Sequence, residues 1–228
     1  MKVSWVNHGL SSSKEPLAIY SVDIQPSGNR FASGGADFKV KIWNLAPLRI
    51  QASSSSSSNN NSNRLLATLA DHEGVVNIVR WSHSGHALAT GADDRTVLIW
   101  QHFPEAQPTS VLGEVPSIEC WRRMITLADH SADITDLCWS PDDSKLASAS
   151  FDSSVIVWDL LSGTRIHRLT HHTGVVKGIA WDPLNKYVFP QKTNKIKKHL
   201  QYSFSFFFIS SSSSFFFSEK KDFWHLKV

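Results

Sequence analysis

The chain has 228 residues, a formal net charge of +3, 41% hydrophobic residues and two cysteines. This length and apolar content suffice to bury a core, whereas two cysteines cannot cross-link a small secreted domain and are not spaced as a C-x-x-C metal site. The sequence has no run of about 18 apolar residues and no signal-peptide pattern at its N-terminus. We therefore expect a reduced, intracellular protein without a membrane span.

The positive charge is concentrated at one end of the chain. Residues 189–228 contain seven lysines against two acidic residues, and they hold nine of the thirteen phenylalanines but none of the eleven glycines. Residues 1–188 carry 16 basic and 18 acidic side chains. The basic charge therefore gives no argument that residues 1–188 contact DNA, and we interpret the two parts separately.

Short β-type segments that end in tryptophan recur along residues 1–188. KVKIW ends at Trp43, TVLIW at Trp100 and SVIVW at Trp158. A second series ends at Trp81, Trp139 and Trp181. The segments alternate with turn sequences such as S-H-S-G and S-P-D-D, which predicts antiparallel strands. A repeated unit of about 40 residues with four strands is typical of one blade of a β-propeller.

We predict an all-β propeller fragment with three full blades and part of a fourth. The predicted blades cover about residues 17–50, 65–105, 122–170 and 171–188. Two insertions interrupt them. Residues 51–63 form a serine- and asparagine-rich tract with nothing to bury, which predicts a disordered loop. The second insertion, QHFPEAQPTSVLGEVPSIECW, contains three prolines, and we expect an ordered excursion that rejoins a strand at RMITLADH.

Each repeat carries a His, a Ser or Thr, an Asp and a Trp at similar offsets. This pattern resembles the buried network of WD40-repeat proteins, in which the Asp holds the imidazole, the imidazole holds the hydroxyl and the hydroxyl holds the indole N–H. The resemblance places these sets at His72, Thr90, Asp94 and Trp100; at His130, Ser148, Asp152 and Trp158; at Ser33, Asp37 and Trp43, with His8 as the candidate fourth member; and at His172, which opens the fourth blade.

The same residue types allow a catalytic interpretation, which we find less favourable. His130, Ser148 and Asp152 could form a nucleophilic triad, but the set recurs in the preceding repeat with Thr90, and a catalytic site is needed only once. The sequence has no G-x-S-x-G elbow. The histidines of the SHSGH turn lack the carboxylate or cysteine companions of a zinc site. We therefore predict a protein that is not an enzyme and uses no metal or other cofactor.

Residues 189–228 lack the repeat pattern. Phe and Ser can be written with pyrimidine-only codons, and Lys, Asn and Ile with A- and T-rich ones, as in a translated polypyrimidine tract and its surroundings. A disordered tail is normally poor in aromatic residues, and serines interrupt every Phe cluster, which disfavours a membrane anchor. We interpret this tail as an intron read through after Val188, where a WD40 blade continues with its second strand.

The most specific resemblance is to the amino-terminal propeller of the HIRA family of histone chaperones. It rests on SWVNH, YSVDIQPSGNRFASGGADFKVKIWN, PSIECW and VVKGIAWDPLNKYV, and it covers about residues 4–188. It implies a nuclear WD-repeat protein of replication-independent nucleosome assembly and transcriptional repression. The implied partners are a ubinuclein-type subunit and, through the complex, H3–H4 histones, without direct sequence-specific binding of nucleic acid. The family ring is seven-bladed, so 188 residues are too few to close it.

Two related interpretations remain open. The propeller subunit of chromatin assembly factor 1 shares the WDPLxKYV element, and this alternative links the chain to replication-coupled assembly. A generic WD40 adaptor, such as a substrate receptor of a ubiquitin ligase, is the broader alternative, although the blades contain no basic cluster suited to a degron.

Overall fold

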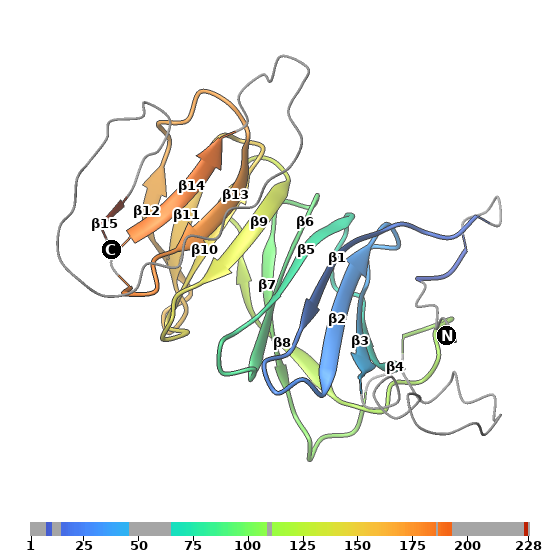
Figure 1. Ribbon diagram of the computed structural model, residues 1–228. Helices are drawn as coiled ribbons and strands as arrows, with labels where there is room; N and C mark the ends of the chain where they lie inside the picture. Colours follow the sequence, from blue (N-terminus) through green and yellow to red (C-terminus); the bar gives the residue numbers. More distant parts are fainter. Residues whose placement is uncertain are drawn as a thin grey trace, which may run out of the picture.

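The fold is built from strands arranged as separate antiparallel sheets. The computed structural model describes residues 8–10, 15–45, 65–108, 111–185, 187–192 and 226–227. Within these ranges all regular elements are β-strands, and they form three four-stranded sheets and one three-stranded sheet that succeed one another along the chain (Figure 1). The prediction of an all-β propeller fragment with three full blades and an incomplete fourth is confirmed.

The strands of each sheet are consecutive in the chain. The first sheet contains β1 (Ile19–Ile24), β2 (Arg30–Gly35), β3 (Val40–Asn44) and β4 (Leu65–Leu69). The second contains β5 (Val76–Trp81), β6 (Ala87–Ala92), β7 (Val97–His102) and β8 (Trp121–Leu127). The third contains β9 (Ile134–Trp139), β10 (Lys145–Ser150), β11 (Val155–Asp159) and β12 (Thr164–Leu169). The fourth contains β13 (Val176–Trp181), β14 (Tyr187–Lys192) and β15 (Leu226–Lys227).

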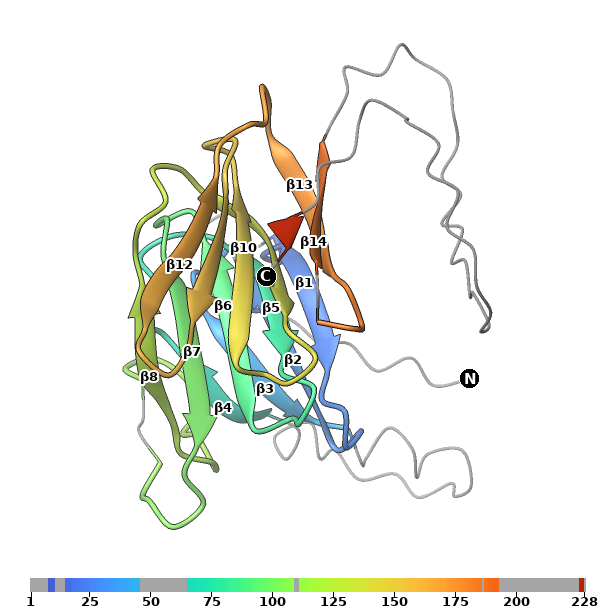
Figure 2. The same ribbon diagram turned by 90° about the vertical axis from the view of Figure 1, so that its left-hand side faces the viewer.

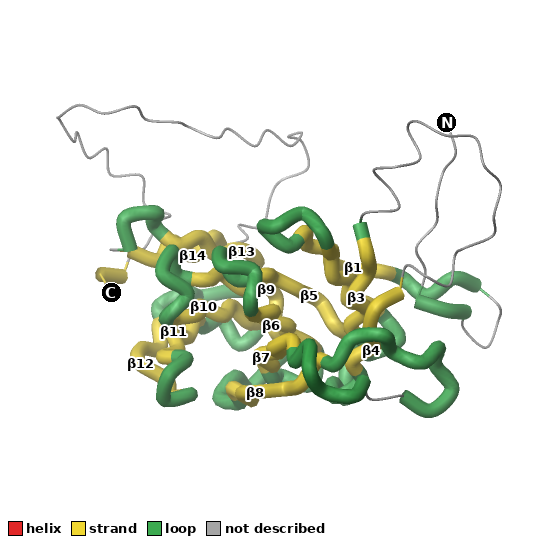
Figure 3. Tube along the Cα trace, turned by 90° about the horizontal axis from the view of Figure 1, so that it is seen from below, coloured by secondary structure: helices red, strands yellow, loops and turns green. Residues whose placement is uncertain are grey.

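The first strand of each sheet lies on one side of the arc and the fourth strand on the other. Figure 3 shows β1, β5, β9 and β13 following one another along one side, and β4, β8 and β12 along the opposite side. We call these the inner and outer strands. This arrangement follows from the meander order of each sheet, because a chain that pairs each strand with the next necessarily puts the first and fourth strands at opposite edges.

The sheet boundaries correct the predicted blade ranges. The range 65–105 begins with β4, which closes the first sheet, and the range 122–170 begins with β8, which closes the second. After the third strand of a sheet, the chain forms the outer strand of the same sheet and then continues to the inner strand of the next sheet. In the fourth sheet, β14 extends four residues beyond the predicted end at Val188 and pairs with β15. The predicted loop at 51–63 lies outside the described residues.

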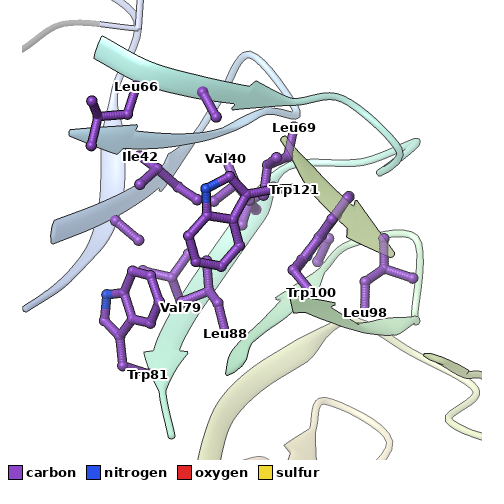
Figure 4. Close-up of a cluster of buried hydrophobic side chains, with 14 residues drawn as sticks. Val40, Ile42, Leu66, Leu69, Val79, Trp81, Leu88, Leu98, Trp100 and Trp121 are labelled. Carbon is purple, nitrogen blue, oxygen red and sulfur yellow. The ribbon is translucent and has the colours of Figure 1, made fainter. Parts of the chain in front are cut away.

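Each sheet has two different faces. One face carries the hydroxyl residue and the tryptophan of the predicted network, and we call it the hydroxyl face. The opposite face carries alanine or glycine on the second strand, and we call it the small-residue face. In each of the three buried clusters, the small-residue face of one sheet packs against the hydroxyl face of the next. Figure 4 shows the first cluster, where Val40 and Ile42 of the first sheet meet Val79 and Trp81 of the second.

Close approach between neighbouring sheets explains the small residues. A Cβ atom on Gly34 would lie 2.5 Å from Cγ1 of Val76, and a Cβ atom on Gly91 would lie 2.5 Å from Cγ2 of Ile134. Real Cβ atoms do not come this close to another carbon, so the second strands of the first two sheets carry glycine where the following sheet touches them.

The fourth sheet departs from this pattern at the first residues after Val188. Phe189 pairs with Ala180 in the fourth sheet, and Ala147 pairs with Cys138 in the third, so Phe189 and Ala147 occupy equivalent positions. Pro190 likewise occupies the position that is equivalent to Ser148. The alanines at this position in the first three sheets are fully buried, whereas Phe189 is 40% exposed. Proline also has no N–H to donate to a third strand. The second strand of the fourth sheet therefore lacks both the small side chain and the hydroxyl of the repeat.

The first sheet leaves part of its hydroxyl face uncovered by the described residues. Val22 and Ile24 of β1 are 52% and 56% exposed. The residues at the same register positions in the second sheet, Val79 and Trp81, are 0% and 5% exposed because the first sheet covers them. The arc thus presents two unlike end faces, one with exposed Val22 and Ile24 and one with Phe189.

Candidate functional site

The predicted polar network of the second sheet is present. Nδ1 of His72 lies 2.7 Å from a carboxylate oxygen of Asp94, and Nε2 of His72 lies 2.7 Å from Oγ1 of Thr90. Nε1 of Trp100 donates to the same hydroxyl oxygen over 2.9 Å. Second-strand Thr90 and third-strand Trp100 come together because β6 and β7 pair directly, and Asp94 lies in the turn between them.

The third sheet repeats this geometry with serine. His130 lies 2.9 Å from Asp152 through Nδ1 and 2.8 Å from Ser148 through Nε2, and Trp158 donates to Oγ of Ser148 over 2.8 Å. The similarity of the two sets of distances follows from the equal sequence offsets between the histidines, hydroxyl residues, aspartates and tryptophans.

The first sheet has a network as well, and its histidine is His8. Nδ1 of His8 lies 2.6 Å from Asp37, and Nε2 of His8 lies 2.7 Å from Oγ of Ser33, to which Trp43 donates over 2.8 Å. The longer connection between His8 and β1 does not displace the imidazole. The remaining predicted member, His172, is buried in the loop before β13, and by register Pro190 occupies the position of the hydroxyl residue that it would meet.

The aspartates of the second and third sheets each fix two backbone segments. Asp94 accepts a hydrogen bond from the N–H of Thr96, two residues later, and one from the N–H of Glu73 in the loop that carries His72. The residue that follows each aspartate has a positive φ: 64° at Phe38, 66° at Arg95 and 65° at Ser153. A single carboxylate thereby ties the turn between the second and third strands to the loop that enters the sheet.

The direction of each hydrogen bond follows from the donors available. An indole N–H can only donate, so the hydroxyl oxygen accepts from tryptophan and its own hydrogen is donated to Nε2 of the neutral imidazole. The imidazole proton then resides on Nδ1 and is donated to the aspartate. Ser33, Thr90 and Ser148 are fully buried, so no substrate can approach their hydroxyl oxygens. The networks therefore hold each sheet together rather than activate a nucleophile.

The charges of the networks follow from burial and from these hydrogen bonds. Burial acts to raise the pKa of Asp94, but hydrogen bonds and charge from His72, with hydrogen bonds from Thr96, outweigh it and hold that pKa well below its usual value. The pKa of Asp152 is also lowered, since the Ser154 hydroxyl, the Ser131 N–H and His130 outweigh burial. Burial lowers the pKa of His130 despite Asp152. The His130 imidazole is therefore neutral near pH 7, and the Asp94 and Asp152 carboxylates are charged.

We expect the free energy of unfolding to fall as the pH is lowered. The pKa of His130 is lower in the folded chain than its ordinary value of 6.5, so below that pH the unfolded chain binds a proton that the folded chain does not. The lowered pKa values of Asp94 and Asp152 add a further loss as the pH falls below 3.8, their ordinary value. Urea midpoints measured by tryptophan fluorescence should be level between about pH 8 and about pH 7 and should fall between about pH 6 and about pH 3. A flat profile would contradict this assignment.

The second insertion is ordered in its described part and docks on the first sheet. The N–H groups of Ile118 and Glu119 donate to the carbonyl oxygen of Leu66 on the outer strand β4, over 2.8 and 2.9 Å. The Glu119 carboxylate accepts from both Nε and Nη2 of Arg30, and from Nε1 of Trp121. A carboxylate oxygen of Glu114 also lies 3.4 Å from Nζ of Lys41 in β3. The PSIECW element therefore joins the second repeat to the first sheet.

Sequence reasoning did not assign roles to Arg30 and Glu119. The two residues are 89 positions apart, and neither belongs to the repeated set. The signal that could have found Glu119 was its place in PSIECW, which was the most specific part of the resemblance. Because the pair is bidentate and mostly buried, it fixes the insertion more firmly than an exposed ion pair would.

The described ranges show neither a metal centre nor a membrane-spanning helix. No group of three or more His, Cys, Asp or Glu side chains in these ranges is arranged to hold a metal ion. None of the same residues forms a helix long and apolar enough to cross a membrane.

Comparison with known proteins relates this chain to one family of β-propeller domains. A family of CAF1B/HIR1 β-propeller domains matches residues 2–211. The chain is 40% identical over 198 residues to Protein HIR1 of Cryptococcus neoformans var. neoformans, which covers 86% of this chain and 22% of the relative. It is 43% identical over 163 residues to Protein HIRA of Oryza sativa subsp. japonica, covering 71% and 16%. It is 39% identical over 201 residues to Protein hir1 of Schizosaccharomyces pombe, covering 86% and 21%. The chain thus spans about a fifth of the length of these relatives.

Proposed function

Since this chain belongs to the family of CAF1B/HIR1 β-propeller domains, we propose that it serves as a HIRA-like, non-enzymatic scaffold of a nuclear histone chaperone complex. It docks a ubinuclein-type subunit, and the complex deposits H3–H4 histones independently of replication and represses transcription. The observation that carries this proposal is the 40% identity to Protein HIR1 across 86% of the chain. Direct sequence-specific contact with nucleic acid is not part of the proposed role.

The fold supports a docking role rather than catalysis. Three sheets are each locked by a buried network, and successive sheets are joined by continuous apolar clusters. The turns and loops at the two ends of such rigid sheets are free to vary in sequence and to contact other proteins.

Co-purification tests this proposal directly. An affinity-tagged chain is co-expressed with a ubinuclein-type subunit and H3–H4 histones, and in parallel with the other subunits of chromatin assembly factor 1. We expect the ubinuclein-type subunit and the histones to be retained. A Ser148→Ala variant, in which the network of the third sheet is broken, serves as the folding-defective control. Retention of the replication-coupled subunits instead, or of neither set, would reject the HIRA-like role.

The propeller subunit of chromatin assembly factor 1 is the second candidate, because the matching family includes that subunit by name. The high-identity relatives HIR1 and HIRA favour the first candidate. A generic WD40 adaptor, such as a ubiquitin-ligase substrate receptor, has no specific observation in its favour.

We further propose that residues 189–228 derive from an intron retained after codon 188. This proposal is supported by Phe189 and Pro190, which stand where the other sheets have a buried alanine and a hydroxyl residue. Because the family match continues to residue 211, the transcript is the direct test between a retained intron and a coding exon. Sequencing across codon 188 is expected to find a spliced message that encodes a small residue and a hydroxyl residue after Val188. A spliced message that encodes the present tail from a separate exon would reject the proposal.

A further inference from the structure

The three complete sheets end differently at their outer strands. On the outer edge of β4 the chain itself supplies residues 117–119, which bend at Ile118 and Glu119. Their backbone N–H groups bind Leu66, and the Ser117 hydroxyl accepts from the N–H of Thr68. β8 has the same place in the second sheet, and it is the last strand of that sheet among the described residues. Figure 2 shows β8 at the margin of the molecule. An edge of this kind offers backbone donors and acceptors to an added strand.

The exposed side chains of β8 favour a partner segment with negative charge. Trp121 and Leu127 at its ends are buried, whereas the central Arg122, Arg123 and Met124 are exposed. The Arg122 guanidinium lies 5.3 Å from the centre of the Phe103 ring, a contact that leaves its N–H donors available to a carboxylate. Nε of Arg123 is 3.4 Å from Asp71, but the two side chains are 45% and 42% exposed. An exposed pair of this kind contributes little to stability, so a partner's carboxylate can replace Asp71.

The outer strand of the third sheet is also basic, but one of its arginines, Arg168, is tied to a buried network, and the other forms an exposed pair like that of Arg123. Arg165 is paired with Asp129, and Arg168 donates to the Asp129 carbonyl oxygen and to the carboxylate of Asp152, which belongs to a buried network. A ligand that drew Arg168 away would disturb that network. Among the three outer strands, β8 is therefore the one that combines an uncovered edge with arginines available to a ligand.

We propose that the outer edge of β8 binds an extended, acidic segment of a partner protein, which adds to the second sheet as a fifth strand. Backbone pairing along the seven residues of β8 supplies affinity, as in other cases of strand addition. Carboxylates at alternate positions of the added strand meet Arg122 or Arg123, and apolar residues between them pack near Met124. The backbone of β4 at the neighbouring outer edge already binds residues 117–119 through Leu66 and Thr68, although these residues do not form a strand.

Three synthetic peptides test the proposal against the full chain. The first is a fluorescently labelled peptide that alternates Glu and Val, the second replaces each Glu by Lys, and the third is the Glu peptide with N-methyl groups on alternate residues. Fluorescence anisotropy should show binding of the Glu peptide, with at least about tenfold weaker binding of both others. Amide hydrogen exchange along β8 should slow when the Glu peptide is bound. Equal binding of the N-methylated peptide would overturn strand addition, because the charges would then suffice without backbone pairing.

Charge reversal identifies the strand involved. The double variant Arg122→Glu with Arg123→Glu should lose the Glu peptide and gain the Lys peptide, whereas Arg165→Glu on β12 should bind the Glu peptide as the unaltered chain does. An unchanged tryptophan emission spectrum verifies the fold of each variant, and the N-methylated peptide tests the unaltered chain independently of any variant. Loss of binding in Arg165→Glu alone, or failure of the unaltered chain to bind the Glu peptide, would overturn the assignment to β8.

Discussion

Replacement of Gly91 by valine is expected to cost about 3 kcal/mol of unfolding free energy and to loosen the contact between the second and third sheets. The first added carbon alone would lie 2.5 Å from Cγ2 and 2.9 Å from Cβ of Ile134, and 2.9 Å from Cγ2 of Ile78. Because Ile134 is fully buried, it cannot turn into solvent to make room. The sheets must separate instead, and part of the apolar cluster between them is lost.

The measurement is urea unfolding followed by tryptophan fluorescence. Gly91→Ala should fall between the native chain and Gly91→Val, because it adds only the first carbon. The matched control is Ala149→Gly, at the same register position of the third sheet, where the cost should be about 1 kcal/mol or less. If Gly91→Val unfolds at the same urea concentration as the native chain, the two sheets do not approach as closely as the structure has them.

Ser148→Ala is expected to lower the unfolding free energy by about 2–5 kcal/mol. The substitution leaves the indole N–H of Trp158 without its acceptor and Nε2 of His130 without its donor, and both groups are buried. Each unpaired buried group costs about 1–3 kcal/mol. Ser148→Thr should be close to neutral, because Thr90 performs the same role in the second sheet.

The same pair of variants separates a structural from a catalytic role. If Ser148 were a nucleophile, Ser148→Ala would fold normally and lose only a hydrolytic activity towards an activated ester. The structure instead predicts a lower thermal midpoint for Ser148→Ala and a midpoint near the native one for Ser148→Thr. A Ser148→Ala variant as stable as the native chain would refute the role of the buried network.

The polar networks were predictable because their geometry repeats. The offsets of 28 residues from His72 to Trp100 and from His130 to Trp158 are identical, and units of the same fold are expected to place equivalent residues in equivalent contacts. The set at His8 could be inferred from its aspartate and tryptophan although its histidine lies further away. The structure brings all three sets together as the resemblance implied.

The limits of the repeats were not predictable in the same way. A period defines the length of a unit but not the strand at which a sheet begins, so β4 and β8 were assigned to the sheets that follow them. The contact between Arg30 and Glu119 lies outside the period altogether, since it joins an insertion of one repeat to a strand of another. Information of this kind resides in tertiary contacts between segments far apart in the sequence, and local patterns do not contain it.

The unlike end faces of the arc have a consequence for self-association. Contact between a small-residue face and a hydroxyl face is a head-to-tail contact, and repeated head-to-tail contacts between copies of a molecule produce either closed rings or open filaments. The first sheet exposes Val22 and Ile24 on its hydroxyl face, which is one side of such a contact. On the small-residue face of the fourth sheet, Phe189 stands where the other side of the contact requires alanine. The bulk of Phe189 therefore disfavours head-to-tail association of copies of this chain through these two faces.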